Sequence, residues 1–586
     1  MSAEPADGAG PAPARRLPRP AEAAAVVLLL GLHAGLAVDS LWSKAVTRDE
    51  NSHLPAGLAA VATGEIRLNR QHPPLVKLLA GLAAAGSAPH LPLDGEAYRA
   101  AAEWDFGFEV LFARGNDHWG MLRRGRLPTV ALSVLGGLAV FAWSRALFGA
   151  AGGLLSLSLY AFEPTVLAHA RWVTMDVPVA ALGAWALFAW WRAARSGLRP
   201  LPCALAGLAL GLALAAKFSA LALLPAMAAC EFAAARRAGF GRRLAAWAIV
   251  LAAAALVLQA AYLSPAGPLE YLRDARLINA DHVPGYPFYL AGSFSPERYP
   301  HYFLVAMAVK SSLPSLLAML WGLAWAGAIT VRGLGGGLGR GLGGPAADAA
   351  FLWLPALGWL AATSALAADI GVRYALPAYP LLFVLAGSLP RALARHSRFG
   401  AGVATAGLTL AQLTTAAAVH PDYLPYFNRL AGGPEHGPCW LDDSNLDWGQ
   451  DLADLPAWLA AHGVGSVRLL HAGAASPGFY GVAGGPIEEA DWTGRPRPGW
   501  YVLSAHALVR GLDWADTRGV ATDWLRRYRP VDVLRGSMYL YRFGDGEPAP
   551  GPWPPCIPSA PDRAAGERRP ANAAPPPAPG GAEGAR

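Results

Sequence analysis

Residues 127–168 read LPTVALSVLGGLAVFAWSRALFGAAGGLLSLSLYAFEPTVLA and contain only one basic and one acidic side chain, Arg145 and Glu163. A transmembrane helix needs about 20 predominantly apolar residues. The stretch is long enough for two such helices, and it predicts successive membrane spans at 127–147 and 149–168.

Similar apolar runs recur on both sides of this pair. They lie at Ala23–Val38, 177–194, 201–216, 218–234, 244–263, 301–330, 350–367, 374–390 and 400–419. Together with the pair they predict a polytopic α-helical membrane protein of about 11 transmembrane helices. The first run follows a basic segment, as in a secretory signal, but so many spans follow that we expect an uncleaved first helix.

The composition supports a membrane protein. The 586 residues are 54% hydrophobic and only 15% charged, with a mean hydropathy of +0.30, whereas ordinary soluble domains carry about 25% charged residues. A chain of soluble domains is therefore excluded. The net charge is +7, but the arginines lie in short loops between apolar runs, where they set topology. No nucleic-acid partner is expected.

Basic side chains concentrate in alternate loops between the predicted spans. With a cytoplasmic N-terminus, the inside loops hold Arg145, Arg192, Arg195, Arg199, Arg236, Arg237, Arg242, Arg243, Arg332, Arg340, Arg391, Arg395 and Arg398. The short outside loops near 169–176 and 367–373 hold one arginine each. Because cytoplasmic loops are enriched in Lys and Arg, we expect a multi-pass protein of the inner (plasma) membrane. Loops 47–125 and 264–300 and the C-terminal region are then extracytoplasmic.

The chain divides into four parts by composition. Residues 1–20 predict a disordered cytoplasmic end, and residues 21–419 hold all the apolar runs and form the membrane domain. Residues 420–545 contain short apolar runs between amphipathic segments, which predict a small extracytoplasmic α/β domain. Residues 546–586 are rich in Pro, Ala and Gly and predict a disordered tail.

Short elements are expected outside the spans. In the C-terminal domain they are strands at Val467–Leu470, Trp500–Ser504 and Met538–Tyr541, and helices near Asp451–His462 and Trp514–Tyr528. In the outer loop they are Leu54–Thr63 and Leu75–Ala85, which are too short to span and predict helices at the membrane interface. The four cysteines show no CxxC spacing and predict neither a metal site nor a disulfide framework. A single pair of Cys439 with Cys556 outside the cell stays open.

Polar residues gather near span ends on the predicted outer side. They are Arg48-Asp49-Glu50-Asn51-Ser52-His53, His72, Lys77, Arg171, Asp176, Lys217, Tyr299, His301, Tyr302, Lys310, Arg373 and Tyr374. Ionisable residues at membrane depth are costly and mark functional sites. Carboxylates, cations and aromatic side chains on one membrane face suit an anionic substrate carried by a lipid.

Several of these segments resemble glycosyltransferase family 39, the protein O-mannosyltransferase and aminoarabinose transferase group, in its bacterial phospholipid-carrier-dependent form. They are RDENSHLPAGLAAVATGEIRLNRQHPPLVKLLAGL at 48–82, HARWVTMDVP at 169–178 and DIGVRYALPAYP at 369–380. The resemblance implies a C-type glycosyltransferase fold. It also implies transfer of a sugar from a polyprenyl phosphate to an acceptor hydroxyl, with inversion, at the outer membrane face.

The same resemblance implies roles for individual residues. Asp49 is the expected general base, Glu50 would hold sugar or acceptor hydroxyls, and Asp176 would orient donor or acceptor. The expected substrate-binding residues are His53, His72, Lys77, Lys217, Lys310, Arg373 and Tyr374. These roles make chemical sense, because an acceptor hydroxyl needs a base and a leaving phosphate needs fixed cations.

Other interpretations of these residues remain open. Asp49 and Glu50 fit ordinary interfacial charge, and Asp176 fits a helix cap before Pro178. Lys217 and Lys310 fit lysines that extend from span ends towards water, and Arg373 fits an interface anchor. A flippase or carrier for lipid-linked sugars would use the same charged face without catalysis. The acidic residues lie on one side only and there is no internal repeat, which favours the enzyme over a carrier.

No cofactor is expected, although a divalent metal stays open. Glu50, His53 and His72 carry metal-ligating groups, but they lack the HExxH spacing of a metalloprotease. Residues 443–454 resemble a calcium loop in their alternating oxygens, or a turn closed by side-chain hydrogen bonds. The chain has no large insertion in its outer loops, and His72 replaces the lysine usual in the aminoarabinose group. The sugar is therefore open, and so is the acceptor, whether lipid, glycan or protein.

Overall fold

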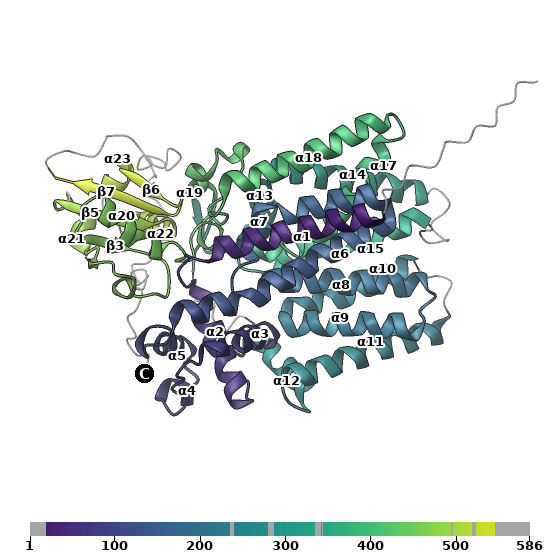
Figure 1. Cartoon of the computed structure of the whole chain (residues 1–586), viewed down its shortest axis with the longest axis horizontal. Helices are drawn as coiled ribbons and strands as arrows, with labels where there is room; N and C mark the ends of the chain where they lie inside the picture. The colour runs from purple at the N-terminus through teal and green to yellow at the C-terminus, as the bar shows by residue number, and fades with distance from the viewer. Residues whose placement is uncertain are drawn as a thin grey trace, which may run out of the picture.

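The computed structural model describes residues 19–234, 239–278, 286–334, 342, 344–493, 496–518 and 523–544. Long helices lie alongside one another in a bundle, and a small sheet domain sits at one end of it (Figure 1). The short helices of the outer loop lie at the same end (Figure 1). The two predicted disordered ends fall outside the described residues, except for Arg19 and Pro20.

The described residues include seven helices that are long and apolar enough to cross a membrane. They are α1 (Arg19–Leu41), α6 (His118–Ala161), α8 (Asp176–Arg195), α11 (Phe240–Ala261), α14 (Leu313–Leu334), α15 (Gly344–Leu366) and α18 (Arg398–Val419). Shorter apolar helices occupy other predicted spans, namely α9 (Pro200–Ala216), α10 (Leu223–Ala234), α16 (Ala378–Ala386) and α17 (Leu389–Leu393). The predicted polytopic helical architecture is therefore confirmed.

Helix α6 is two helical legs joined at Gly149. Gly149 has φ +83° and ψ −177°, a backbone conformation that glycine adopts without a steric penalty. The legs pack against each other, because Tyr160 Oη donates to the carbonyl of Ser133 at 3.0 Å. The two spans predicted from residues 127–168 are thus separate legs, and the short helix α7 (Pro164–His169) follows the second.

The run predicted as one span at 301–330 is broken. Helix α13 (Tyr302–Lys310) ends before α14 begins, and the two serines between them are bound by other helices. Ser311 Oγ lies 2.8 Å from Tyr379 Oη, and Ser312 donates through its backbone N–H and its hydroxyl to Glu163. Apolar content alone does not reveal such a break, because the flanking residues are all compatible with a span.

The loop at 47–125 folds into helices that pack on each other. They are α2 (Arg48–Thr63), α3 (Leu75–Ala84), α4 (Glu96–Arg99) and α5 (Glu103–Phe108). Helices α2 and α3 cross where Gly57 meets Gly81, since a Cβ on Gly57 would lie 1.9 Å from the carbonyl oxygen of Lys77. Residues 50–60 of α2 are all buried, so α2 is an internal helix of the outer region and does not lie free on a surface. A further short helix, α12 (Gly267–Asp274), and a hairpin of β1 (Phe288–Leu290) and β2 (Ser293–Ser295) come from loop 264–300.

The C-terminal domain contains a five-stranded mixed sheet with strand order β4-β3-β5-β7-β6. The strands are β3 (Val467–Leu470), β4 (Gly484–Pro486), β5 (Gly499–Ser504), β6 (Asp532–Leu534) and β7 (Met538–Phe543). Strand β3 is parallel to β4 and β5, and β7 is antiparallel to β5 and β6. The three predicted strands are present. The two missed strands are three-residue edge strands, and β4 reads only Gly-Gly-Pro.

Helices accompany this sheet with bounds that differ in part from those predicted. They are α19 (Gly437–Trp440), α20 (Leu455–Ala461), α21 (Glu489–Thr493), α22 (Ala505–Arg518) and α23 (Asp523–Arg527). The single helix predicted at Trp514–Tyr528 is wrong, because α22 begins directly after β5 and α23 is a separate helix. Cys439 is disulfide-bonded, and Cys556, with which a pair was left open, lies outside the described residues.

Candidate active site

Two carboxylates and two cations from four distant segments meet at the end of the bundle. Asp49 lies in the first turn of α2, Asp176 begins α8, Lys217 follows α9, and Arg373 lies in the turn before α16. Arg373 Nη1 is 2.7 Å from Asp49 Oδ2 and 3.7 Å from Asp176 Oδ2. Lys217 Nζ is 2.5 Å from Asp176 Oδ1. We call these four residues the central cluster.

Aromatic rings border the central cluster. The ring of Tyr374 lies 4.5 Å from Lys217 Nζ and 5.1 Å from the Arg373 guanidinium carbon. The ring of Trp448, from the C-terminal domain, lies 4.4 Å from the same guanidinium carbon. Aromatic faces attract cations, so the two rings help to hold both positive side chains in place.

The two carboxylates of the cluster differ in accessibility. The side chain of Asp49 is 22% exposed, whereas that of Asp176 is 2% exposed and contacts both cations. Asp176 is therefore suited to orient Lys217 and Arg373, and Asp49 is suited to meet a substrate.

Several buried polar atoms around the cluster lack a hydrogen-bond partner among the described residues. They are Arg373 Nε, His169 Nδ1 and Thr174 Oγ1. A buried polar group without a partner is costly and calls for an explanation. The free N–H of Arg373 in particular offers a donor to an anionic ligand.

His53 and His72 lie next to each other beside the cluster. Their rings are 5.0 Å apart and nearly perpendicular, and His53 Nδ1 is 2.8 Å from the carbonyl oxygen of Val173. Burial lowers the pKa of both histidines, and for His72 the nearby positive charges act in the same direction. The neutral form of both rings is therefore favoured relative to histidine in water. Among the described residues, no group of three or more His, Cys, Asp or Glu could hold a metal ion.

Glu50 points away from the central cluster. Its carboxylate is fully buried and forms a two-pronged ion pair with Arg126, at 2.8 Å for each contact. It also accepts hydrogen bonds from the backbone N–H groups of Thr47 and Val173, both at 3.0 Å. The first of these bonds satisfies a free N–H at the start of α2. Glu50 thus links the loop before Asp49 to the loop before Asp176.

Two of the predicted lysines are bound by backbone carbonyls outside the cluster. Lys77 donates to the carbonyls of Asn69 and His72. Lys310 donates to the carbonyls of Leu424 at 2.6 Å and Asn445 at 2.7 Å. The structure therefore brings Asp49, Asp176, Lys217, Arg373 and Tyr374 together, with His53 and His72 beside them. Glu50, Lys77 and Lys310 are instead bound by other groups of the same chain.

Three residues of the site were not identified from the sequence: Arg126, His169 and Trp448. Arg126 lies inside α6, near Arg123 and Arg124, and no motif marks it. His169 stands within a segment quoted for the family resemblance, and Trp448 within the stretch 443–454 that resembles a calcium loop, so proximity to those motifs was the only signal available for them. Their rings lie 5.8 Å apart.

Residues 442–451, here called the docking segment, include the stretch that resembles a calcium loop. Its carboxylates are bound by protein groups: Asp442 by His506 and Arg510, and Asp447 by the backbone N–H of Gly449. Asp443 accepts from the next backbone N–H at 2.7 Å. These bonds favour the turn interpretation.

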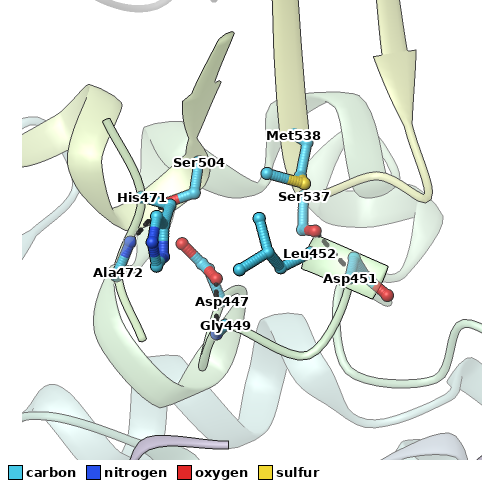
Figure 2. A pocket seen from close by; sticks show the side chains of 9 residues that line it. All are labelled: Asp447, Gly449, Asp451, Leu452, His471, Ala472, Ser504, Ser537 and Met538. Carbon is cyan, nitrogen blue, oxygen red and sulfur yellow. Dashed lines mark hydrogen bonds between the residues drawn. The ribbon is translucent and has the colours of Figure 1, made fainter. Parts of the chain in front are cut away.

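A small cavity lies between the docking segment and the sheet, where β3 and β5 end (Figure 2). Asp447, His471 and Ser504 are among its lining residues. Burial raises the pKa of Asp447 to about 6 and lowers that of His471 to about 4. The space it leaves is too small for even one water molecule, and therefore for a sugar carried on a lipid phosphate.

Comparison with known proteins identifies the class to which the chain is similar. Residues 112–263 match the model of the dolichyl-phosphate-mannose-protein mannosyltransferase family. The resemblance to this group of membrane glycosyltransferases is thereby confirmed over a region that includes Asp176 and Lys217. A comparison with curated proteins finds no match.

Similar chains also occur among solved structures. ArnT from Cupriavidus metallidurans in the apo state is 14% identical with a TM-score of 0.44, covering 89% of this chain and 98% of that chain. The same protein bound to undecaprenyl phosphate is 14% identical with a TM-score of 0.40, covering 88% and 97%. The Archaeoglobus fulgidus oligosaccharyltransferase in the apo form is 12% identical with a TM-score of 0.46, covering 75% and 58%.

Proposed function

We propose that this chain is a C-type glycosyltransferase that moves a sugar from a polyprenyl-phosphate donor to an acceptor hydroxyl. The reaction takes place at the extracytoplasmic face of the inner membrane, with the N-terminus in the cytoplasm. The observation that carries the proposal is the central cluster, in which two carboxylates and two cations meet at one end of the helix bundle. The match of residues 112–263 to a mannosyltransferase family supports it.

The cations of the cluster are suited to a phosphate leaving group. Lys217 and Arg373 both reach Asp176, so their charges are close enough together to act on one phosphate. Negative charge grows on the phosphate oxygen as the bond to the sugar breaks, and fixed cations stabilise that charge. The unpartnered N–H of Arg373 Nε is a further donor for this purpose.

Asp49 is the proposed general base. Donor phosphate competes with Asp49 for Arg373, and its binding frees the carboxylate to accept the proton of the acceptor hydroxyl. The hydroxyl oxygen then forms a bond to the anomeric carbon as the bond from that carbon to the phosphate oxygen breaks. Attack opposite the leaving group inverts the configuration at the anomeric carbon.

The decisive experiment compares Asp49→Asn with wild type in membrane vesicles supplied with a panel of polyprenyl-phosphate sugars. We expect normal folding and insertion but a loss of sugar transfer of roughly 100- to 10,000-fold, the range for general bases. Asp39→Asn is the matched control, because Asp39 at the end of α1 is 74% exposed, and it should leave transfer unchanged.

Two other outcomes of this experiment would contradict parts of the proposal. Full turnover by Asp49→Asn would remove Asp49 from the role of base. A wild-type protein that moves lipid-linked sugar across the membrane, yet transfers none from the whole panel, would instead identify a carrier.

A further inference from the structure

The docking segment is attached on one side to the turn that carries Arg373. Asn445 Oδ1 accepts a hydrogen bond from the backbone N–H of Val372 at 2.8 Å. The chains approach so closely here that a Cβ on Gly371 would lie 2.2 Å from Ser444 Oγ. The segment therefore holds the backbone immediately before Arg373.

On its other side the docking segment is attached to the loop that leads into α2. The carbonyl of Trp448 accepts from the backbone N–H of Arg48 at 3.1 Å, and the carbonyl of Gln450 accepts from that of Ala45 at 2.9 Å. The bond to Arg48 lies one residue before Asp49. One short segment of the C-terminal domain thus bonds next to both members of the ion pair in the central cluster.

The side chain of Trp448 enters the space between these two attachments. It is 4% exposed, and its ring lies against the guanidinium of Arg373 on one side and the ring of His169 on another, at 4.4 Å and 5.8 Å. Tyr374 also lies against the guanidinium, at 5.1 Å. Arg373 is therefore bordered by aromatic rings from the membrane domain and from the C-terminal domain.

The orientation of this guanidinium determines what it can bind. A single nitrogen, Nη1, reaches both Asp49 and Asp176, while Nε has no partner among the described residues. A rotation of the group would move Nη1 away from the two carboxylates and lose the bridge. Errors of about 1 Å in the placement of a reacting group reduce rates strongly, so whatever limits this rotation affects turnover.

We propose that Trp448 is a positioning residue for Arg373, and that the C-terminal domain thereby completes the active site of the membrane domain. The inference rests on the proposed function, because it assigns the docking segment a part in the same phosphate-binding arrangement. Trp448 acts through Arg373 and does not itself contact the reacting atoms.

The test compares Trp448→Leu and Trp448→Phe with wild type in the full-length protein. The matched control is Trp458→Leu, because Trp458 is a buried tryptophan of the same domain that stacks on His462 at 3.8 Å. Three quantities are measured: transfer from a donor that wild type uses, binding of undecaprenyl phosphate, and thermal stability. We expect Trp448→Leu to lose roughly 10- to 30-fold in kcat/KM and to bind undecaprenyl phosphate more weakly, in line with a desolvated cation–π contact.

The variants distinguish positioning from general destabilisation. Trp448→Phe keeps an aromatic face and should recover most of the loss, whereas Trp458→Leu should lower thermal stability and leave kcat/KM unchanged. Equal kcat/KM for Trp448→Leu and wild type would overturn the inference while the proposed function stands, and so would equal losses in Trp448→Leu and Trp458→Leu. A wild-type protein that neither transfers sugar nor binds undecaprenyl phosphate would overturn both.

Discussion

Adjacent carboxylates in the first turn of α2 have different surroundings. Successive residues of a helix point about 100° apart, so Asp49 faces the central cluster while Glu50 faces the interior. There Glu50 meets Arg126, which also donates to the backbone carbonyls of Leu41, Lys44 and Ala45. The pair therefore fixes the loop that positions Asp49.

This arrangement predicts that Glu50→Gln destabilises the protein more than Asp49→Asn does. Removing one member of a fully buried ion pair leaves the other charge unpaired and costs about 3–5 kcal/mol. Asp49 is partly exposed, and its loss leaves Arg373 in contact with Asp176. Thermal unfolding of both variants in detergent would measure the difference. If Glu50→Gln kept the wild-type unfolding temperature but lost transfer, Glu50 would act on substrate, as the family resemblance implies.

The sequence patterns identified the residues of the central cluster better than they identified the residues that support the cluster. Asp49, Asp176, Lys217 and Arg373 were predictable because each is a charge near the end of an apolar run and lies at a position that the family resemblance also points to. Glu50 and Lys310 show the same local pattern, but they are bound by other groups of the same chain and not by the central cluster. Whether such a charge joins the cluster depends on the direction in which its side chain points from the helix and on its partners far away in the sequence. Neither can be derived from a single sequence without the fold.

At the scale of elements, the crossing of α2 and α3 is unusually close. A Cβ on Gly57 would lie 1.9 Å from the carbonyl oxygen of Lys77, and one on Gly81 would lie 2.2 Å from the carbonyl carbon of Gly57. Both contacts involve backbone atoms, which cannot rotate away as a side chain can. The position of α2, and with it Asp49, depends on these two glycines.

We therefore expect Gly81→Ala to destabilise the protein by about 1–3 kcal/mol, the usual cost of overpacking, and to reduce transfer because α2 is displaced. Gly35→Ala in α1 is the control, since a Cβ there meets nothing within 4 Å and alanine favours a helix. Unfolding temperature and transfer rate would be measured together for both variants. A Gly81→Ala protein as stable and active as wild type would show that the crossing is not required.

Elements were predictable where a regular pattern was long. The apolar runs are largely helical because about 20 residues of one character leave few alternatives. The break between α13 and α14 was missed because it depends on two serines that are bound by other helices. The short strands β4 and β6 were missed because three residues carry no periodicity.

At the scale of the whole molecule, the C-terminal domain is docked firmly on the end of the bundle. Lys44, in the loop after α1, is 1% exposed and lies 2.6 Å from Asp422, 2.6 Å from Asp451 and 3.3 Å from Asp454. This docking was not predictable, because the contacts join residues about 400 positions apart and leave no local signal. The sorting of charges between loops, by contrast, predicts topology from the sequence alone.

A second buried cluster holds the docking segment to α22. Burial alone would raise the pKa of Asp442, but the positive charges of His506 and Arg510 outweigh burial and lower it. Burial alone would lower the pKa of His506, but Asp442, 2.8 Å away, outweighs burial and raises it. The charge of Asp443 supports the shift of His506, and that of Arg510 opposes it. Asp442 and His506 are therefore both charged near pH 6.

The sign of each shift gives the pH dependence of stability. The contribution of His506 is complete below about pH 6.5, its ordinary pKa, and is lost as the pH rises through the raised value. The contribution of Asp442 is present above about pH 3.9 and is lost as the pH falls through the lowered value. We therefore expect His506→Asn to lower the unfolding temperature by roughly 3 °C at pH 6, and by less than half of that at pH 9. Trp458→Leu, which removes no titrating group from the same domain, should shift the temperature equally at both pH values. If the effect of His506→Asn stayed constant or grew towards pH 9, the charged pair would not be what holds the docking segment to α22.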